Sequence, residues 1–177
     1  MIRISVMLLS LFVVHIACGA THEDDKNLVK NPGFEATKDG KPVDWTLGGF
    51  SEGGKGTLDS NTEKPHGGKS CAHIKGTGDW GTFVSAKIPI QKGKTYELKG
   101  FVRVGKGNAL IKFDYFKDDM FLGMTAPEYT ESTDWVEVST TSELSSHPEA
   151  THITATLVGG SGEYEAWFDD VSIVEKK

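Results

Sequence analysis

The chain has 177 residues and a formal net charge of −6 at pH 7, with 21 glycines and two cysteines. Nucleic-acid-binding domains normally carry a basic patch. No such patch is visible in this acidic sequence, which favours a neutral ligand or a divalent cation. A chain of this length can form one domain that buries roughly 70% of its unfolded surface, so a second domain is not needed.

Residues 1–20 are expected to be a signal peptide. The run Val6–Val14 is almost wholly apolar, and it is shorter than the stretch of about 20 residues that a membrane-spanning helix needs. Small residues follow it, as at a secretory cleavage site after Ala20. Residues 21–26 are polar and are expected to form a short tether, so the folded domain should occupy residues 27–177. These features predict an exported protein, either secreted or held at the cell envelope.

Cys18 leaves two alternatives open for the mature N-terminus. The segment Ile16-Ala-Cys-Gly also resembles the lipobox of a bacterial lipoprotein, whose cysteine carries the lipid, although His15 stands where leucine is usual. Cys18 is therefore either a lipid anchor, which would be the chain's only link to a membrane, or part of a discarded peptide. In both cases Cys71 is left as a single cysteine, and no intrachain disulfide is expected.

The glycine content and the frequent two-residue alternation of apolar and polar residues predict an all-β domain of short strands and turns. No long stretch repeats with the period of a helix. Trp45 is expected to pack inward as an anchor of the core. In the first half of the chain, the sequence predicts strands at residues 42–47, 57–60, 70–75 and 82–88.

Residues 95–104 and 109–116 form the clearest predicted strand pair, joined through Gly105-Lys-Gly-Asn. Tyr96 and Leu98 share one face of the first strand and Phe113 and Tyr115 share one face of the second, and these faces should meet in the core. The opposite faces mix aromatic, charged and apolar groups, a composition that suits a ligand surface. They carry Lys99, Phe101, Arg103, Leu110, Lys112, Asp114 and Phe116.

Further strands are predicted at residues 120–124, 135–141, 151–158 and 164–174. About ten antiparallel strands with regularly spaced turns indicate a single-domain β-sandwich of the jelly-roll type. In the last strand the apolar residues alternate around Asp169 and Asp170, so at least one carboxylate must enter the interior. A bare buried carboxylate is costly unless it is paired or bound to a metal. The oxygen-rich segment 31–35 is the best candidate to meet it around a shared cation.

Five segments of the chain resemble, in the same order, the carbohydrate-binding modules of families four, nine and twenty-two. They are Asn27-Leu-Val-Lys-Asn-Pro-Gly-Phe-Glu, Gly40-Lys-Pro-Val-Asp-Trp, Gly67-Gly-Lys-Ser, Gly93-Lys-Thr-Tyr-Glu-Leu-Lys-Gly-Phe-Val-Arg and Trp167-Phe-Asp-Asp-Val-Ser-Ile. The resemblance implies a galactose-binding-like jelly roll, a structural calcium ion near the chain ends, and glycan binding by aromatic side chains.

Carried onto this chain, the resemblance implies that Glu35 and Asp169 are calcium ligands, helped by backbone oxygens near Gly33 and in the turn 68–70. This agrees with the preference of Ca²⁺ for about 6 to 8 oxygen ligands from carboxylates and carbonyls. The alternative is that Glu35 is a surface residue and that Asp169 accepts hydrogen bonds at the end of a strand.

Trp80 is the leading candidate for sugar binding, because an indole offers an apolar face to a pyranose ring and a donor at its edge. The alternative is that Trp80 caps the core beneath its glycine-rich loop. Phe116 and Arg103 are expected to line the same groove, with Asp114, Lys112 and Thr154 hydrogen-bonding to sugar hydroxyls. An ordinary solvated sheet face is the alternative for this second group.

The sequence shows neither a nucleophile elbow nor a phosphate loop, and the protein is not expected to be an enzyme. We expect a monomeric, exported module that binds a polysaccharide or other glycan without catalysis. The alternative is a structural or adhesive sandwich that keeps the calcium and has lost sugar binding. Trp80 discriminates between the two: if it is exposed beside a groove it supports binding, and if it is buried it favours the structural alternative.

Overall fold

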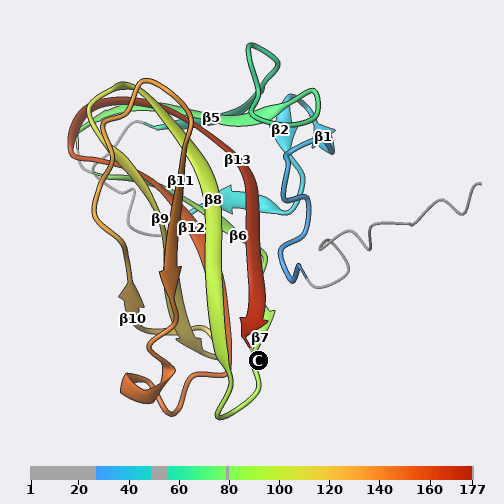
Figure 1. Cartoon of the computed structure of the whole chain (residues 1–177), viewed down its shortest axis with the longest axis vertical. Helices are drawn as coiled ribbons and strands as arrows, with labels where there is room; N and C mark the ends of the chain where they lie inside the picture. Colours follow the sequence, from blue (N-terminus) through green and yellow to red (C-terminus); the bar gives the residue numbers. More distant parts are fainter. Residues whose placement is uncertain (1–26, 49–55, 79, 177) are drawn as a thin grey trace, which may run out of the picture.

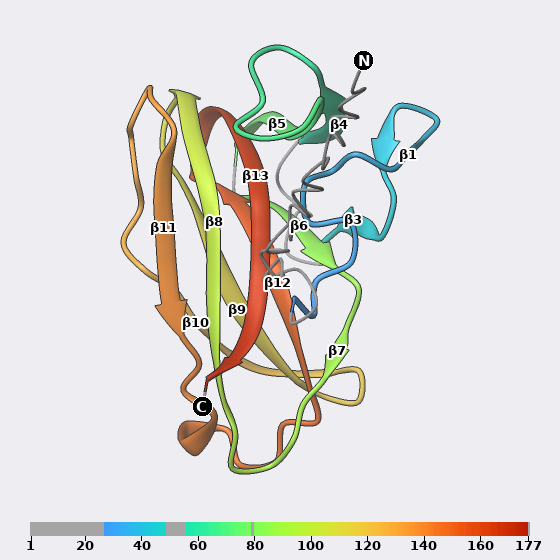
Figure 2. The ribbon, with the colours of Figure 1, turned by 45° about the vertical axis from the view of Figure 1, so that its right-hand side comes forward.

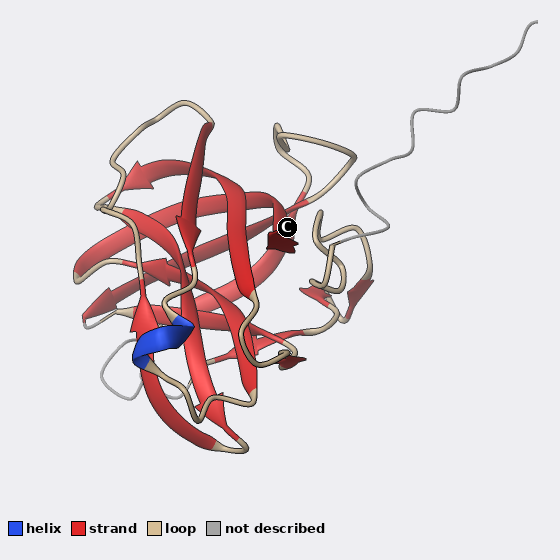
Figure 3. Ribbon diagram, turned by 60° about the horizontal axis from the view of Figure 1, so that its bottom comes forward, coloured by secondary structure: helices blue, strands red, loops and turns tan. Residues whose placement is uncertain are grey.

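The computed structural model describes residues 27–48, 56–78 and 80–176. The signal peptide, the tether and the lipid-anchor alternative at Cys18 therefore lie outside the described residues. Within them the protein is a β-sandwich with one 3₁₀ turn at Leu144–Ser146 (Figure 3). No helix of the described part is long and apolar enough to cross a bilayer.

The strands follow one another along the chain and belong to two large sheets and one small hairpin. They are β1 (Thr37–Lys38), β2 (Lys41–Pro42), β3 (Trp45–Leu47), β4 (Thr57–Asn61), β5 (Cys71–Gly78), β6 (Gly81–Ser85), β7 (Ile88–Pro89), β8 (Thr95–Lys106), β9 (Ala109–Lys117), β10 (Met120–Thr125), β11 (Val136–Thr141), β12 (His152–Gly159) and β13 (Gly162–Lys176). The predicted all-β sandwich is confirmed, with more and shorter strands than expected at its N-terminal end.

The two sheets lie face to face, with β11, β8 and β13 in one layer and β9, β12 and β6 in the other (Figures 1 and 2). The first is a five-stranded sheet in the order β11-β8-β13-β5-β4. The second is a six-stranded sheet in the order β10-β9-β12-β6-β3, with β7 also pairing with β12. All of the pairings between these strands are antiparallel.

The core lies between the sheets and follows the two-residue alternation of each strand. In β8 the inward residues are even-numbered, such as Leu98 and Val102, and in β9 they are odd-numbered, such as Phe113 and Tyr115. Trp45 is buried, as predicted, and its ring packs on Phe34 with centroids 5.0 Å apart. Burial of these large apolar side chains is the main source of stability.

The expected hydrogen-bonded pairing of residues 95–104 with 109–116 is wrong. These segments are β8 and β9, and they belong to opposite sheets. Their inward faces do meet in the core, but across the sandwich. The short link at residues 107–108 crosses from one layer to the other, and Gly107 has a φ of +69° there, which glycine adopts without strain. Consequently the outward faces of β8 and β9 point to opposite sides of the molecule.

The first described residues hold the last strand in place. The backbone N–H of Leu28 donates to the Ile173 carbonyl at 2.9 Å, and the N–H of Val171 donates to the Pro32 carbonyl at 3.0 Å. The Asn27 side chain also donates a hydrogen bond to the Val171 carbonyl and accepts one from the backbone N–H of Ile173. The segment 27–32 therefore runs beside β13, which brings residues 31–35 close to the two aspartates of that strand.

Candidate functional site

A groove of about 540 Å³ lies on the outer face of the six-stranded sheet. It is formed by side chains of β3, β6, β9, β10 and β12, together with the link after β6. Its volume is in the range of small-ligand sites, about 300 to 1,000 Å³. The residues that line it are Thr46, Leu47, Gly48, Thr82, Val84, Ser85, Ala86, Lys87, Asp114, Phe116, Phe121 and Thr154.

One wall of the groove is aromatic. The rings of Phe116 and Phe121 meet edge to face, with centroids 5.8 Å apart. The ammonium of Lys87 lies 4.9 Å from the centre of the Phe116 ring and is held by the Asp118 carbonyl and the Asp119 carboxylate, both at 2.6 Å. This wall offers an apolar surface beside a fixed cation, a combination that suits a ligand with apolar faces and a polar rim.

The floor of the groove is a buried polar network. Asp114 is 3% exposed and Lys112 is 7% exposed, and the two side chains form an ion pair. The other Asp114 oxygen accepts a hydrogen bond from Thr156 at 2.7 Å, and Thr156 in turn lies 3.3 Å from the Thr154 hydroxyl. Because these side chains bond to one another, the Asp114 carboxylate is held in a fixed position. Asp114 and Thr154 both line the groove at this point.

Trp80 stands at the other end of the same sheet. It directly precedes β6, whose first residue, Gly81, pairs with Gly159 of β12, whereas Phe116 pairs with His152. The pairs are seven residues apart along β12, or about 24 Å at about 3.4 Å per residue. Trp80 is 50% exposed, so the alternative of a buried cap on the core is wrong.

The structure therefore brings together some of the predicted binding residues and separates others. Asp114 and Phe116 line the groove, while Lys112 precedes Asp114 by two residues on the same face of β9, outside the groove lining, and is ion-paired with it. Trp80 is at the far end of the face. Arg103 lies in β8, on the opposite sheet, so the expectation that it shares a groove with Phe116 is wrong. That expectation followed from the mistaken pairing of β8 with β9.

Sequence reasoning missed Phe121, Leu47 and Lys87 as groove residues. Leu47 is 58% exposed and Phe121 is 38% exposed, which is unusual for large apolar side chains. A signal was present for Phe121, because the segment Met120-Phe-Leu-Gly-Met is too apolar for an ordinary polar connection. No pattern in the sequence indicated that β3 and β10 would border the same face.

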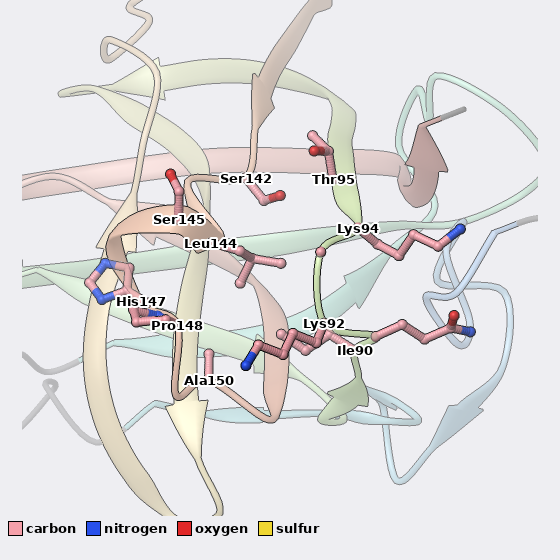
Figure 4. A pocket seen from close by; sticks show the side chains of 12 residues that line it. Ile90, Lys92, Lys94, Thr95, Ser142, Leu144, Ser145, His147, Pro148 and Ala150 are labelled. Carbon is pink, nitrogen blue, oxygen red and sulfur yellow. The ribbon is translucent and has the colours of Figure 1, made fainter.

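A second cavity of about 320 Å³ lies at the end of the sandwich, between the turn 90–95 and the segment 142–150. Figure 4 shows Leu144 and Ala150 facing the turn that carries Lys92, while the Lys94 side chain points away. The only aromatic ring among its lining residues is that of His147, which already stacks on Tyr115 with centroids 4.7 Å apart. This cavity therefore offers no free aromatic face to a sugar.

The predicted metal ligands meet beside the segment that holds β13. A Cβ placed on Gly33 would lie 3.8 Å from the Asp169 Oδ1, 3.9 Å from the Glu35 Cγ and 3.6 Å from the Asp170 Oδ1. Three carboxylate side chains thus lie within ordinary van der Waals contact of a Cβ at this position. Among the described residues, no group of three or more His, Cys, Asp or Glu side chains is arranged around one metal position. Backbone oxygens would have to complete a coordination shell.

Backbone amides bind both carboxylates. Asp169 is fully buried, and its Oδ2 accepts hydrogen bonds from the N–H groups of His66 and Gly67 at 2.8 and 3.0 Å. One Glu35 oxygen accepts from the N–H groups of Lys69 and Ser70 at 2.7 and 3.1 Å. Both side chains therefore connect the turn 66–70 to this end of the sandwich. Each carboxylate has a second oxygen that is not hydrogen-bonded to this turn.

Burial raises the pKa of Asp169 from 3.8 to about 6, and the nearby Asp170 carboxylate adds to the rise, although the amide hydrogen bonds oppose it. No basic side chain pairs with Asp169 in the described part of the chain. The imidazole of His66 lies 2.7 Å from Asp170 instead. The donor set of hard carboxylate oxygens that lack a full counter-charge fits a calcium ion.

Solved structures share this fold. A xylan-binding domain from Paenibacillus barcinonensis has a TM-score of 0.60 at 18% identity, with 82% of this chain and 92% of that chain covered. A Clostridium thermocellum xylanase fragment complexed with xylohexaose has a TM-score of 0.62 at 19% identity, over 86% of this chain and 29% of that one. A module complexed with β-1,4-galactotriose has a TM-score of 0.54 at 16% identity, with 85% of this chain and 99% of that chain covered.

No curated protein matches this sequence. The family of carbohydrate-binding domains that unites the types four and nine matches residues 26–158, which is most of the folded domain. Together with the five motifs in register and the two-layer sandwich, this match identifies the family. The chain belongs to the carbohydrate-binding domain family of types four and nine.

Proposed function

We propose that this protein is a non-catalytic module that binds a polysaccharide or oligosaccharide along the outer face of its six-stranded sheet. The observation that carries the proposal is the distribution of aromatic side chains on that face. Trp80 is exposed at one end and Phe116 and Phe121 form a wall at the other, about 24 Å away by strand register. Between them lies a polar surface. This spacing suits an extended chain of several sugar rings.

The two aromatic ends and the polar floor have different tasks in this proposal. The ring faces of Trp80 and Phe116 bury the apolar faces of pyranose rings. Asp114 and Thr154 accept or donate hydrogen bonds to hydroxyl groups, and Lys112 holds the Asp114 carboxylate in place. The solved structures of similar fold support this ligand class, since one is a xylan-binding domain and two are complexes with xylohexaose and β-1,4-galactotriose.

A catalytic pair of carboxylates is not supported by the geometry. Asp114 belongs to the six-stranded sheet, whereas Glu163 and Glu165 belong to β13 in the opposite sheet. Glu163 pairs with Lys106, and Glu165 with His73 and Lys75. Glycoside hydrolysis requires two carboxyl groups about 5 to 10 Å apart on either side of one bond. Asp114 therefore does not flank a common bond together with either glutamate.

The proposal includes a structural calcium ion held by Glu35 and Asp169, with the Gly33 region supplying backbone oxygens. The ion would supply positive charge between the buried Asp169 carboxylate and the carboxylate of Glu35, an exposed residue. The side chains then connect three distant parts of the chain: the first segment, the turn 66–70 and the last strand. The module would be exported, and Cys18 remains the candidate site for a lipid anchor.

The test is the retention of the purified domain in affinity gels that contain soluble xylan or galactan. Trp80→Ala and Phe116→Ala are each expected to weaken retention at least tenfold, because each removes a stacking surface. Leu28→Ala is the matched control, since Leu28 is also a half-exposed apolar residue, 40% exposed, but lies beside β13 on the other sheet.

Unchanged retention in both groove variants would contradict the proposed site. Absence of retention by the unaltered domain on a panel of neutral polysaccharides would favour the structural or adhesive role instead. Melting temperatures of all variants should be measured in parallel, so that loss of binding is separated from loss of folding.

A further inference from the structure

A depression of about 510 Å³ lies on the outer face of the five-stranded sheet, on the opposite side of the molecule from the groove. Arg103 of β8 and Trp167 of β13 form its base, and they are neighbours because these two residues pair in the sheet register. Glu63, Lys64 and Thr133 contribute from the adjoining loops. None of these residues belongs to the groove or to the cluster of carboxylates near Gly33.

Arg103 is held between two indole rings. Its guanidinium carbon lies 4.3 Å from the centre of the Trp167 ring and 5.4 Å from that of Trp135. The Trp135 ring is fixed in turn, because its Nε1 donates to the Lys64 carbonyl at 3.1 Å. Such contacts orient a guanidinium without using any of its five hydrogen-bond donors.

The donors of Arg103 have no acceptor in the part of the chain that the structure describes. No ion pair or hydrogen bond joins its side chain to another described residue, and its buried Nε is without a partner. A buried donor without an acceptor costs about 1 to 3 kcal/mol, and native proteins retain few of them. An oriented arginine without an acceptor is suited to bind a planar anion, because its guanidinium can donate two parallel hydrogen bonds to a carboxylate.

The Trp167 indole fixes the position of Arg103. Its buried Nε1 also lacks a partner among the described residues. The ring is stacked on His73 with centroids 5.0 Å apart, and His73 is fixed between Asp59 and Glu165 at 3.0 and 3.1 Å. With His73 and Arg103 both packed against it, the indole is held in place and is not a stacking platform for a sugar.

We propose that this depression is a second binding site, specific for the carboxylate of an acidic sugar residue such as a hexuronate. The Arg103 guanidinium, held over the face of the Trp167 indole, binds the carboxylate. Thr133, Lys64 and Glu63 surround this base with groups that bind hydroxyls. The Glu63 carboxylate can accept hydrogen bonds from hydroxyl groups. The choice of a sugar rests on the proposed function.

The test uses the indole N–H signals in the NMR spectrum of the ¹⁵N-labelled domain, with Trp167→Phe to assign the Trp167 signal. Galacturonate is expected to shift that signal saturably, and galactose and acetate at least tenfold more weakly. Arg103→Gln should abolish the response. Arg103→Lys, which keeps the charge without the fork, should weaken it at least fivefold with an unchanged melting temperature.

A Trp167 signal that galacturonate leaves unmoved would overturn the proposal, as would a response that survives in Arg103→Gln. An equal response of the Trp167 signal to acetate would overturn the assignment of the ligand as a sugar. A stronger response to tetraglutamate would overturn it as well and would indicate an acidic peptide as the ligand. The Trp80 signal distinguishes the two sites. If neutral oligosaccharides fail to move it while galacturonate moves the Trp167 signal, the proposed function fails and the second site stands.

Discussion

Asp169 provides the sharpest test of the proposed calcium site, because its charge is buried and uncompensated in the metal-free protein. Burial raises its pKa from 3.8 to about 6. Since the folded pKa lies above the unfolded one, the unfolded state binds fewer protons at this group between pH 4 and pH 6. The free energy of unfolding of the metal-free protein should therefore fall as pH rises through this window.

The magnitude follows from the size of the pKa change. A change of about two units corresponds to about 3 kcal/mol, which is fully lost by pH 7. Asp169→Asn removes the titrating group, keeps the side-chain volume and retains an oxygen that can accept from the N–H groups of His66 and Gly67. The difference in unfolding free energy between the two proteins should therefore change by about 2.4 kcal/mol between pH 4 and pH 7.

Calcium should reverse this loss at neutral pH. An ion that binds only the folded state adds about 2.7 kcal/mol when its concentration is about 100 times its dissociation constant. The unaltered protein should gain this stability at pH 7 and much less at pH 4.5, where protons compete for the carboxylates. Asp169→Asn and Glu35→Gln should gain little at either pH.

The assay is urea unfolding at a series of pH values, in EDTA and in calcium. Comparing each variant with the unaltered protein under the same condition removes the contribution of all other titrating groups. The reasoning is refuted if calcium leaves the unfolding free energy of the unaltered protein unchanged at pH 7. Full stabilisation of Asp169→Asn by calcium would refute the role of this side chain.

Three further substitutions test other parts of the structure by urea unfolding. Lys112→Met leaves the buried Asp114 carboxylate without its cation and should destabilise the domain by about 3 to 5 kcal/mol, whereas a loss below 1 kcal/mol would mean that the pair is solvated. Gly159→Ala places a methyl group where the Tyr164 ring lies 2.2 Å away and should cost about 1 to 3 kcal/mol, and a neutral effect would show that this ring can move. Asn27→Ala removes two hydrogen bonds to β13 and should cost about 1 to 3 kcal/mol, so an unchanged stability would show that the first segment does not hold the last strand.

The local pattern of the chain was sufficient to predict the fold class and much of the calcium hypothesis. Alternation of apolar and polar residues identifies a strand and its buried face without knowledge of its neighbours. The inward faces of β8 and β9 were therefore predicted correctly. The anomaly of Asp169 in an apolar strand was also visible, because burying a carboxylate is costly in any fold.

Tertiary structure alone decided which strands are neighbours, and with them the composition of each outer surface. Alternation gives every strand two faces but does not specify its hydrogen-bonded partner, and a two-residue link can close a hairpin or cross between layers. The sequence thus determined that Arg103 and Phe116 both point outward. Only the assignment of β8 and β9 to opposite sheets placed them on opposite sides of the protein, because the hydrophobic core stabilises facing sheets as readily as paired strands.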